Sequence, residues 1–99
     1  MLPMDTEQLL VLLGKLKPEL SARYRVREIG LFGSFVRAQQ SEASDIDILV
    51  DFDDNADLFD LVGLALFLEE QLQRKVDEVS KSALREELRE SVLQEVVLV

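Results

Sequence analysis

Two aspartates at the start of an apolar segment constrain this chain more than any other feature. Asp45 and Asp47 open the segment 45–51, whose other residues are mostly isoleucine, leucine and valine. Alternating polar and apolar residues are typical of a β-strand, so these two carboxylates should share one face, about 6–7 Å apart. Aspartate is depleted in strand interiors, and such a departure is expected mainly at functional sites. A pair of carboxylates is a suitable ligand set for Mg²⁺.

The residues upstream favour a phosphate-binding turn. Gly33 and Ser34 follow the expected first strand, 26–32, and Arg37 comes three residues after the serine. Backbone N–H groups and a hydroxyl can bind phosphate there, and an arginine one helical turn later faces the same ligand. Taken alone, the Gly33-Ser34 pair is more typical of a plain turn. Arg37 taken alone is more typical of a surface charge. Metal ligands next to a phosphate-binding turn together indicate phosphoryl or nucleotidyl transfer.

Composition limits the class of protein. We expect one small domain over residues 1–99, since a 47% hydrophobic and 31% charged chain is typical of a soluble globular protein. No apolar run approaches the roughly 20 residues that span a bilayer, and no basic leader is present, so we expect a cytoplasmic protein without membrane contact. The chain has no cysteine or histidine for a zinc site. A net charge of −9 argues against direct nucleic-acid binding.

Hydrophobic periodicity predicts seven elements in the order helix, strand, helix, strand, helix, strand, helix. Asp5 and Gln8 form a possible capping box for the first helix, Pro18 should kink it or split off its last turn, and Ser34 is a possible N-cap for the second. The last helix can end as a strand. The expected helices are about 7–22, 34–39, 58–73 and 83–97, and the expected strands are 26–32, 46–52 and 75–80.

The expected third strand brings a further carboxylate. Asp77 should lie on the face opposite Val76, and it joins Asp45 and Asp47 if this strand pairs beside the second. Glu78 should point the other way. The alternative is an edge-strand aspartate in solvent.

Three motifs together resemble those of the minimal nucleotidyltransferases (MNT) of the DNA-polymerase-β superfamily. These motifs are Gly33-Ser34-Phe-Val-Arg37, Ser44-Asp45-Ile-Asp47 and Val76-Asp77. The resemblance extends over nearly the whole chain and implies an α+β fold, with helices packed on a small mixed sheet of three to four strands. Two departures from the family pattern are Ala38, where glycine is common, and Glu78, where an apolar residue is common. Neither removes a family ligand.

The resemblance implies a metal-dependent mechanism. Asp45, Asp47 and Asp77 would form the catalytic set and hold two Mg²⁺ ions, with Mn²⁺ as a substitute, so that both the attacking and the leaving oxygen are stabilised. Asp77 could also take the proton of the acceptor hydroxyl. ATP would be the substrate and AMP the transferred group. The implied nucleotide-binding residues are Gly33, Ser34, Arg37 and Ser44.

The resemblance also implies a partner. Stand-alone domains of this family are commonly encoded beside a HEPN protein, as the antitoxin of that ribonuclease toxin, and some transfer AMP to a hydroxyl of the toxin. Two alternatives stay open at this point. The domain can be a non-catalytic module that binds nucleotide or toxin, or it can modify a small molecule, as aminoglycoside-modifying relatives do.

The third helix suggests a surface for that partner. At 100° per residue, one apolar stripe suits the sheet, and Leu64 and Phe67 fall outside it. We therefore expect these two residues to contact another chain, either a toxin or a second copy, although exposed leucines are also ordinary. The expected core stripe consists of Leu58, Leu61, Val62, Ala65, Leu68 and Leu72.

Overall fold

The computed structural model describes residues 5–41 and 43–99 and has the predicted α+β class. Both central strands have the bounds that the sequence predicted. No helix within the described ranges is long and apolar enough to cross a membrane. The elements are α1 (Thr6–Tyr24), β1 (Val26–Phe32), the 3₁₀ turn η1 (Gly33–Phe35), β2 (Ile46–Phe52), α2 (Leu58–Leu72), β3 (Val76–Ser80), the 3₁₀ turn η2 (Lys81–Ala83), α3 (Glu86–Glu95) and β4 (Val97–Leu98).

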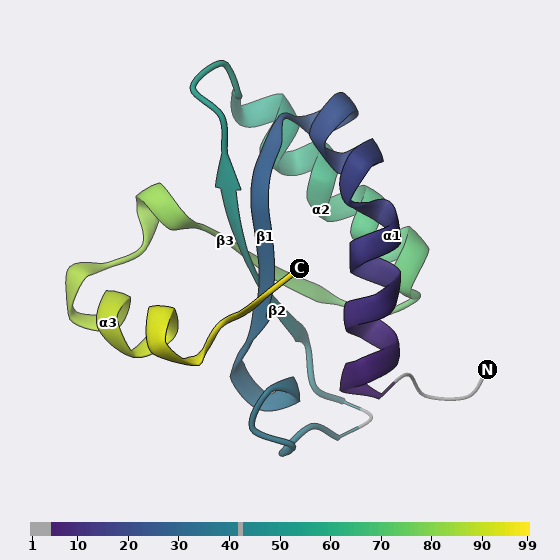
Figure 1. Ribbon diagram of the computed structural model, residues 1–99, viewed down its shortest axis with the longest axis vertical. Helices are drawn as coiled ribbons and strands as arrows, with labels where there is room; N and C mark the ends of the chain where they lie inside the picture. Colours follow the sequence, from purple (N-terminus) through teal and green to yellow (C-terminus); the bar gives the residue numbers. More distant parts are fainter. Residues whose placement is uncertain (1–4, 42) are drawn as a thin grey trace.

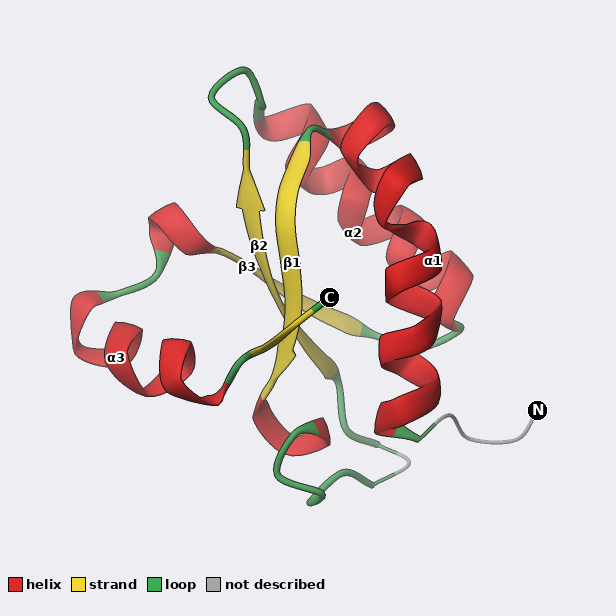
Figure 2. Ribbon diagram, in the orientation of Figure 1, coloured by secondary structure: helices red, strands yellow, loops and turns green. Residues whose placement is uncertain are grey.

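The four strands form one mixed sheet in the order β3-β2-β1-β4. β1 is antiparallel to both of its neighbours, and β2 is parallel to β3. The sequence left the direction of the first two strands open; the short connection 33–45 reverses the chain directly, as an antiparallel pair allows. The sheet stands at the centre of the molecule (Figure 2), with α1 and α2 on one side and α3 on the other (Figure 1).

Helix α1 begins where the sequence predicted. Gln8 N–H donates to Asp5 Oδ1 at 2.8 Å and Asp5 N–H donates to Gln8 Oε1 at 3.0 Å, which completes the capping box. The helix continues through Pro18 to Tyr24, so of the two outcomes predicted for this proline the loss of the last turn does not occur. Its apolar stripe packs on the alternating apolar side chains of the sheet. The core includes Leu9, Leu13, Leu20, Ile29, Leu31, Ile46, Ile48 and Val50.

The predicted core stripe of α2 is right for Leu68 and Leu72, which are buried, and wrong for the first half of the helix. Leu64 has no exposed surface, whereas Leu58 of the expected core stripe is 70% exposed. Phe67 packs on the core, with its ring centroid 5.6 Å from that of Tyr24. Because α2 is apolar on nearly all sides, helical angle alone does not select its buried face; contact with α1 does. Leu64 is fully buried, so the prediction that it contacts a partner is wrong. Phe67 is half-buried against the core, and its contact with another chain stays a prediction.

The C-terminal segment ends as a strand, which the sequence allowed, but its helix is shorter than predicted. In place of one helix over 83–97, η2, α3 and β4 follow one another, and no residue of α3 is buried. β4 pairs with β1 through only two residue pairs, one of which is Gly30 with Leu98. A Cβ on Gly30 would lie 2.7 Å from the carbonyl oxygen of Val97, so this glycine is what lets β4 approach the sheet.

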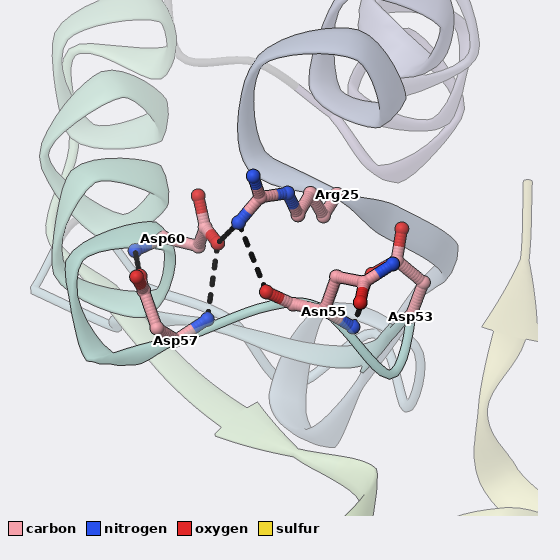
Figure 3. A network of polar contacts seen from close by, with 5 residues as sticks. All are labelled: Arg25, Asp53, Asn55, Asp57 and Asp60. Carbon is pink, nitrogen blue, oxygen red and sulfur yellow. Dashed lines mark hydrogen bonds and ion pairs between the residues drawn. The ribbon is translucent and has the colours of Figure 1, made fainter.

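A polar network joins the start of β1 to the start of α2 (Figure 3). Arg25 Nη1 donates to the Asn55 carbonyl at 2.9 Å and to Asp60 Oδ2 at 3.2 Å. Asp57 and Asp60 form a capping box in which each side chain accepts the other residue's N–H at 3.0 Å. The N-terminus of α2 is thus fixed to the end of the sheet remote from the Asp45 motif.

We expect Asp57→Ala to lower the free energy of unfolding by about 1 kcal/mol, because it removes the N-cap of α2. Urea denaturation followed by circular dichroism measures this change. Asp54→Ala is the matched control, since the Asp54 side chain is fully exposed in the same loop and the change should stay below about 0.5 kcal/mol. Equal effects of the two substitutions would contradict the capping role.

Candidate active site

The site begins at the turn that follows β1. Gly33 adopts φ +77°, a backbone conformation that favours glycine, and a Cβ there would lie 2.1 Å from Asp47 Oδ2. The turn is closed by the N–H groups of Val36 and Arg37, which both donate to the Gly33 carbonyl at 3.1 Å. Glycine is therefore required on two grounds, its backbone angle and the space it leaves for the Asp47 carboxylate.

The predicted role of Ser34 as an N-cap is wrong. The 3₁₀ turn already begins at Gly33, its cap position is Phe32, and no side chain caps it. The turn ends at Phe35 rather than continuing as a helix to residue 39. Ser34 thus lies inside the turn, where it stays a predicted phosphate ligand. Ala38 adopts φ +58°, so the residue that replaces the usual family glycine holds a left-handed conformation.

The central strand places Asp47 between the turn and the third strand. In the sheet register, Asp47 is opposite Phe32 of β1 on one side and opposite Asp77 of β3 on the other. The expectation that β3 pairs beside β2 and brings Asp77 to Asp47 is confirmed. Asp47 is half-buried, while Asp77 and Asp45 are exposed.

The electrostatics of Asp47 reflect this position. Burial, and then the neighbouring carboxylate of Asp77, raise the pKa of Asp47 to about 6, and Asp45 adds a smaller contribution. The guanidinium of Arg37 acts in the opposite direction. The strand thus holds a carboxylate whose negative charge is not fully compensated by the protein.

Glu95 is a residue of this site that the sequence did not reveal. Its Oε2 accepts the Gly33 N–H at 3.0 Å, and its Oε1 accepts a hydrogen bond from Arg37 Nη1 at 2.7 Å. The Gly33 hydrogen bond and then the Arg37 guanidinium lower the pKa of Glu95. Glu95 lies at the end of α3, far from both motifs in sequence, and no local pattern marks it.

Ser44 and Arg74 hold the loop before Asp45. The Ser44 hydroxyl accepts the Ser41 N–H at 2.8 Å, so this predicted nucleotide ligand is engaged within its own loop. Arg74 donates from Nε to the Ser44 carbonyl at 2.8 Å and from Nη2 to the Ser41 carbonyl. Its guanidinium also lies 5.1 Å from the centre of the Phe35 ring, which connects the loop to the turn. Arg74 is a positioning residue that the sequence did not reveal.

Glu78 lies on the core side of β3, opposite Ile48, as the strand alternation predicted. Burial raises the pKa of Glu78 to about 7. Its Oε2 is buried without a hydrogen-bond partner among the described residues. This departure from the family pattern therefore places an ionisable group at a position where an apolar side chain would fit.

The carboxylates are chemically suited to divalent metals, although they do not form a closed cage. In residues 5–41 and 43–99, no three acidic side chains are arranged to hold a metal ion. The uncompensated charge at Asp47, beside Asp77, is what a cation would relieve. Oxygens of a phosphate bound at the adjacent turn would be suitable further ligands for such an ion.

Comparison with known proteins identifies the family of this chain. The family model described as a nucleotidyltransferase domain matches residues 13–99. The protein adenylyltransferase MntA of Thermococcus cleftensis is 48% identical over 83 residues, which cover 84% of this chain and 84% of that protein.

Solved structures show the same fold. A structure assigned provisionally as a minimal nucleotidyltransferase superposes with a TM-score of 0.82 and 38% identity, covering 95% of each chain. A chain from the structure of the tri-AMPylated HEPN toxin of Shewanella oneidensis in complex with MNT antitoxin superposes with a TM-score of 0.63 and 26% identity, covering 89% of this chain and 69% of that chain. The family match and the shared fold show that this chain belongs to the nucleotidyltransferase domain family.

Proposed function

We propose that this protein is a Mg²⁺-dependent adenylyltransferase that transfers AMP from ATP to a hydroxyl side chain of a HEPN toxin, as the antitoxin of a toxin–antitoxin pair in the cytoplasm. The observation that carries the proposal is the position of Asp47, which is opposite Asp77 and directly beside the Gly33 turn. Candidate metal ligands therefore lie next to candidate hydrogen-bond donors for phosphate. The kinship with MntA supports AMP as the transferred group, and the AMPylated toxin complex supports the acceptor.

The chain's own residues have distinct parts in this reaction. The Gly33 turn, with the Ser34 hydroxyl and Arg37, would bind the triphosphate. Asp45, Asp47 and Asp77 would hold the metals, which supply charge neutralisation and a lowered pKa of the acceptor hydroxyl. The acceptor oxygen attacks the α-phosphorus, its proton passes to Asp77, and the bond to the bridging oxygen breaks as pyrophosphate leaves. Ser44 would support the loop that carries Asp45.

We expect the double substitution Asp45→Asn with Asp47→Asn to lower AMP transfer at least about a hundredfold, since the transition state loses its charge stabilisation. The measurement is mass spectrometry of a co-expressed HEPN partner, which detects added AMP. Wild-type protein that leaves the partner unmodified, yet still blocks its ribonuclease activity, would instead support a non-catalytic antitoxin. Asp54→Asn, which lies outside the site, should transfer AMP at the wild-type rate.

Ser34→Ala and Asp77→Asn should separate binding from turnover. Ser34 is proposed to contact phosphate in the ground state and in the transition state alike, so its loss should raise KM for ATP with little change in kcat. Asp77 acts on the attacking hydroxyl only as the bond forms, so Asp77→Asn should lower kcat. Steady-state kinetics with labelled ATP measures both, and an unchanged kcat for Asp77→Asn would remove this residue from the catalytic set.

Asp47→Asn should stabilise the metal-free protein at pH 7. Because the folded-state pKa of Asp47 is about 6 and its ordinary value is 3.8, the folded protein becomes less stable as pH rises from about 4 to 6. Asparagine does not ionise, so it causes no such loss of stability. After allowance for solvent screening, we expect the free energy of unfolding to rise by about 1–2 kcal/mol at pH 7 and to change little below pH 4.

Urea denaturation in EDTA at both pH values tests the expectation. Asp54→Asn is the control, because its side chain is fully exposed and should alter stability little at either pH. A gain for Asp47→Asn that is equal at pH 4 and pH 7 would show that ionisation of Asp47 is not its cause.

A further inference from the structure

The end of α3 brings a carboxylate to the phosphate-binding turn. Glu95 accepts hydrogen bonds from Gly33 N–H at 3.0 Å and from Arg37 Nη1 at 2.7 Å. Both donors belong to the group proposed to bind the triphosphate. Carboxylates and phosphates present negatively charged acceptor oxygens, and they are recognised by the same N–H donors. The Glu95 carboxylate therefore occupies donors that a nucleotide phosphate would need.

The segment that carries Glu95 has few contacts with the rest of the protein apart from Val99, which packs on the core and whose carbonyl accepts a hydrogen bond from Lys17 Nζ at 2.7 Å. No residue of α3 is buried, and β4 contributes only two pairs to the sheet. A cavity of about 150 Å³ remains between this segment and the sheet, with Leu49 on the sheet side and Leu93, Val96 and Leu98 on the other. Elements with few buried contacts open at low free-energy cost. Displacing Glu95 thus requires little disruption of the core.

The ion pair itself can be replaced by a phosphate. The side chain of Arg37 is 51% exposed and that of Glu95 is 21% exposed, so solvent screens their attraction. A triphosphate carries more negative charge than one carboxylate and offers several acceptor oxygens to the same two donors. Exchange of the carboxylate for phosphate therefore keeps the donors satisfied and leaves Glu95 free to enter solvent.

We propose that Glu95 is a built-in competitor of the nucleotide: its carboxylate closes the phosphate-binding turn in the free protein, and the nucleotide displaces it and releases α3 and β4 from the sheet. The inference rests on the proposed function, because it requires that this turn binds a nucleoside triphosphate. It links occupancy of the active site to the state of the C-terminal segment. That segment exposes the apolar side chains of Leu88, Val97 and Leu98.

The opposite role for Glu95 makes the opposite prediction. A carboxylate that held Arg37 in position for the phosphate would strengthen nucleotide binding, and its removal would weaken it. The sign of the change in affinity therefore distinguishes a competitor from a positioning residue.

Glu95→Gln removes the negative charge and keeps the size of the side chain. The matched control is Glu90→Gln, which makes the same charge change at an exposed position of the same helix. There Glu90 Oε1 accepts a hydrogen bond from its helical neighbour Gln94 at 3.4 Å. Isothermal titration calorimetry with Mg²⁺–ATP should show a Kd about threefold lower or better for Glu95→Gln and a wild-type Kd for Glu90→Gln. Circular dichroism confirms that both variants are folded.

Amide hydrogen exchange tests the release of the segment. The Val99 N–H donates to the Ile29 carbonyl at 3.0 Å, and its exchange in the wild-type protein should become faster when Mg²⁺–ATP is added. Unchanged exchange at Val99, or a Kd for Glu95→Gln that is equal to or higher than wild type, overturns the inference and leaves the proposed function standing. If neither the wild-type protein nor Glu95→Gln binds Mg²⁺–ATP, both the proposed function and the inference are overturned.

Discussion

The close approach of the Gly33 turn to Asp47 is the constraint on which the site depends. Phe32 and Asp47 are register partners in the central antiparallel pair, so the chain must leave β1 immediately beside the carboxylate. Only a residue without a Cβ leaves room there, and the same residue must accept φ +77°. The turn that we propose to bind phosphate and the strand that carries the aspartates are therefore fixed by one register.

That register is in turn fixed by the core. Ile46, Ile48 and Val50 point from β2 into the space beneath α1 and α2, and a shift by one residue would exchange them for the aspartates. The same strand register therefore buries these side chains and places Asp47 beside the turn. This explains how a domain with a modest core holds two carboxylates, Asp47 and Asp77, side by side against their repulsion.

The sequence was sufficient wherever a local pattern determined the structure. The apolar patterns predicted the bounds of β1 and β2, and the Asp5–Gln8 capping box predicted the start of α1. The position of Asp77 beside Asp47 was predicted only on the condition that β3 pairs with β2, which the sheet order fulfils. The sequence failed where tertiary contacts decided. A helix that is apolar nearly all round can turn any face inward, and in α2 the packing of α1 selected Leu64. The sequence does not identify Glu95 as a site residue for a similar reason, because the sheet pairing of β4 is what brings it to Gly33.

The two halves of the site are both incomplete, and in complementary ways. The carboxylate half has too much negative charge, which burial and Asp77 reveal in the raised pKa of Asp47. The phosphate half has its donors satisfied by an internal carboxylate, Glu95. A cation alone would relieve the first half but find few protein ligands, since no three acidic groups in the described ranges are arranged around one ion. A triphosphate alone would bring further negative charge beside Asp47. Bound together, each supplies what the other lacks, so the geometry favours joint binding of metal and nucleotide, with reciprocal coupling between them.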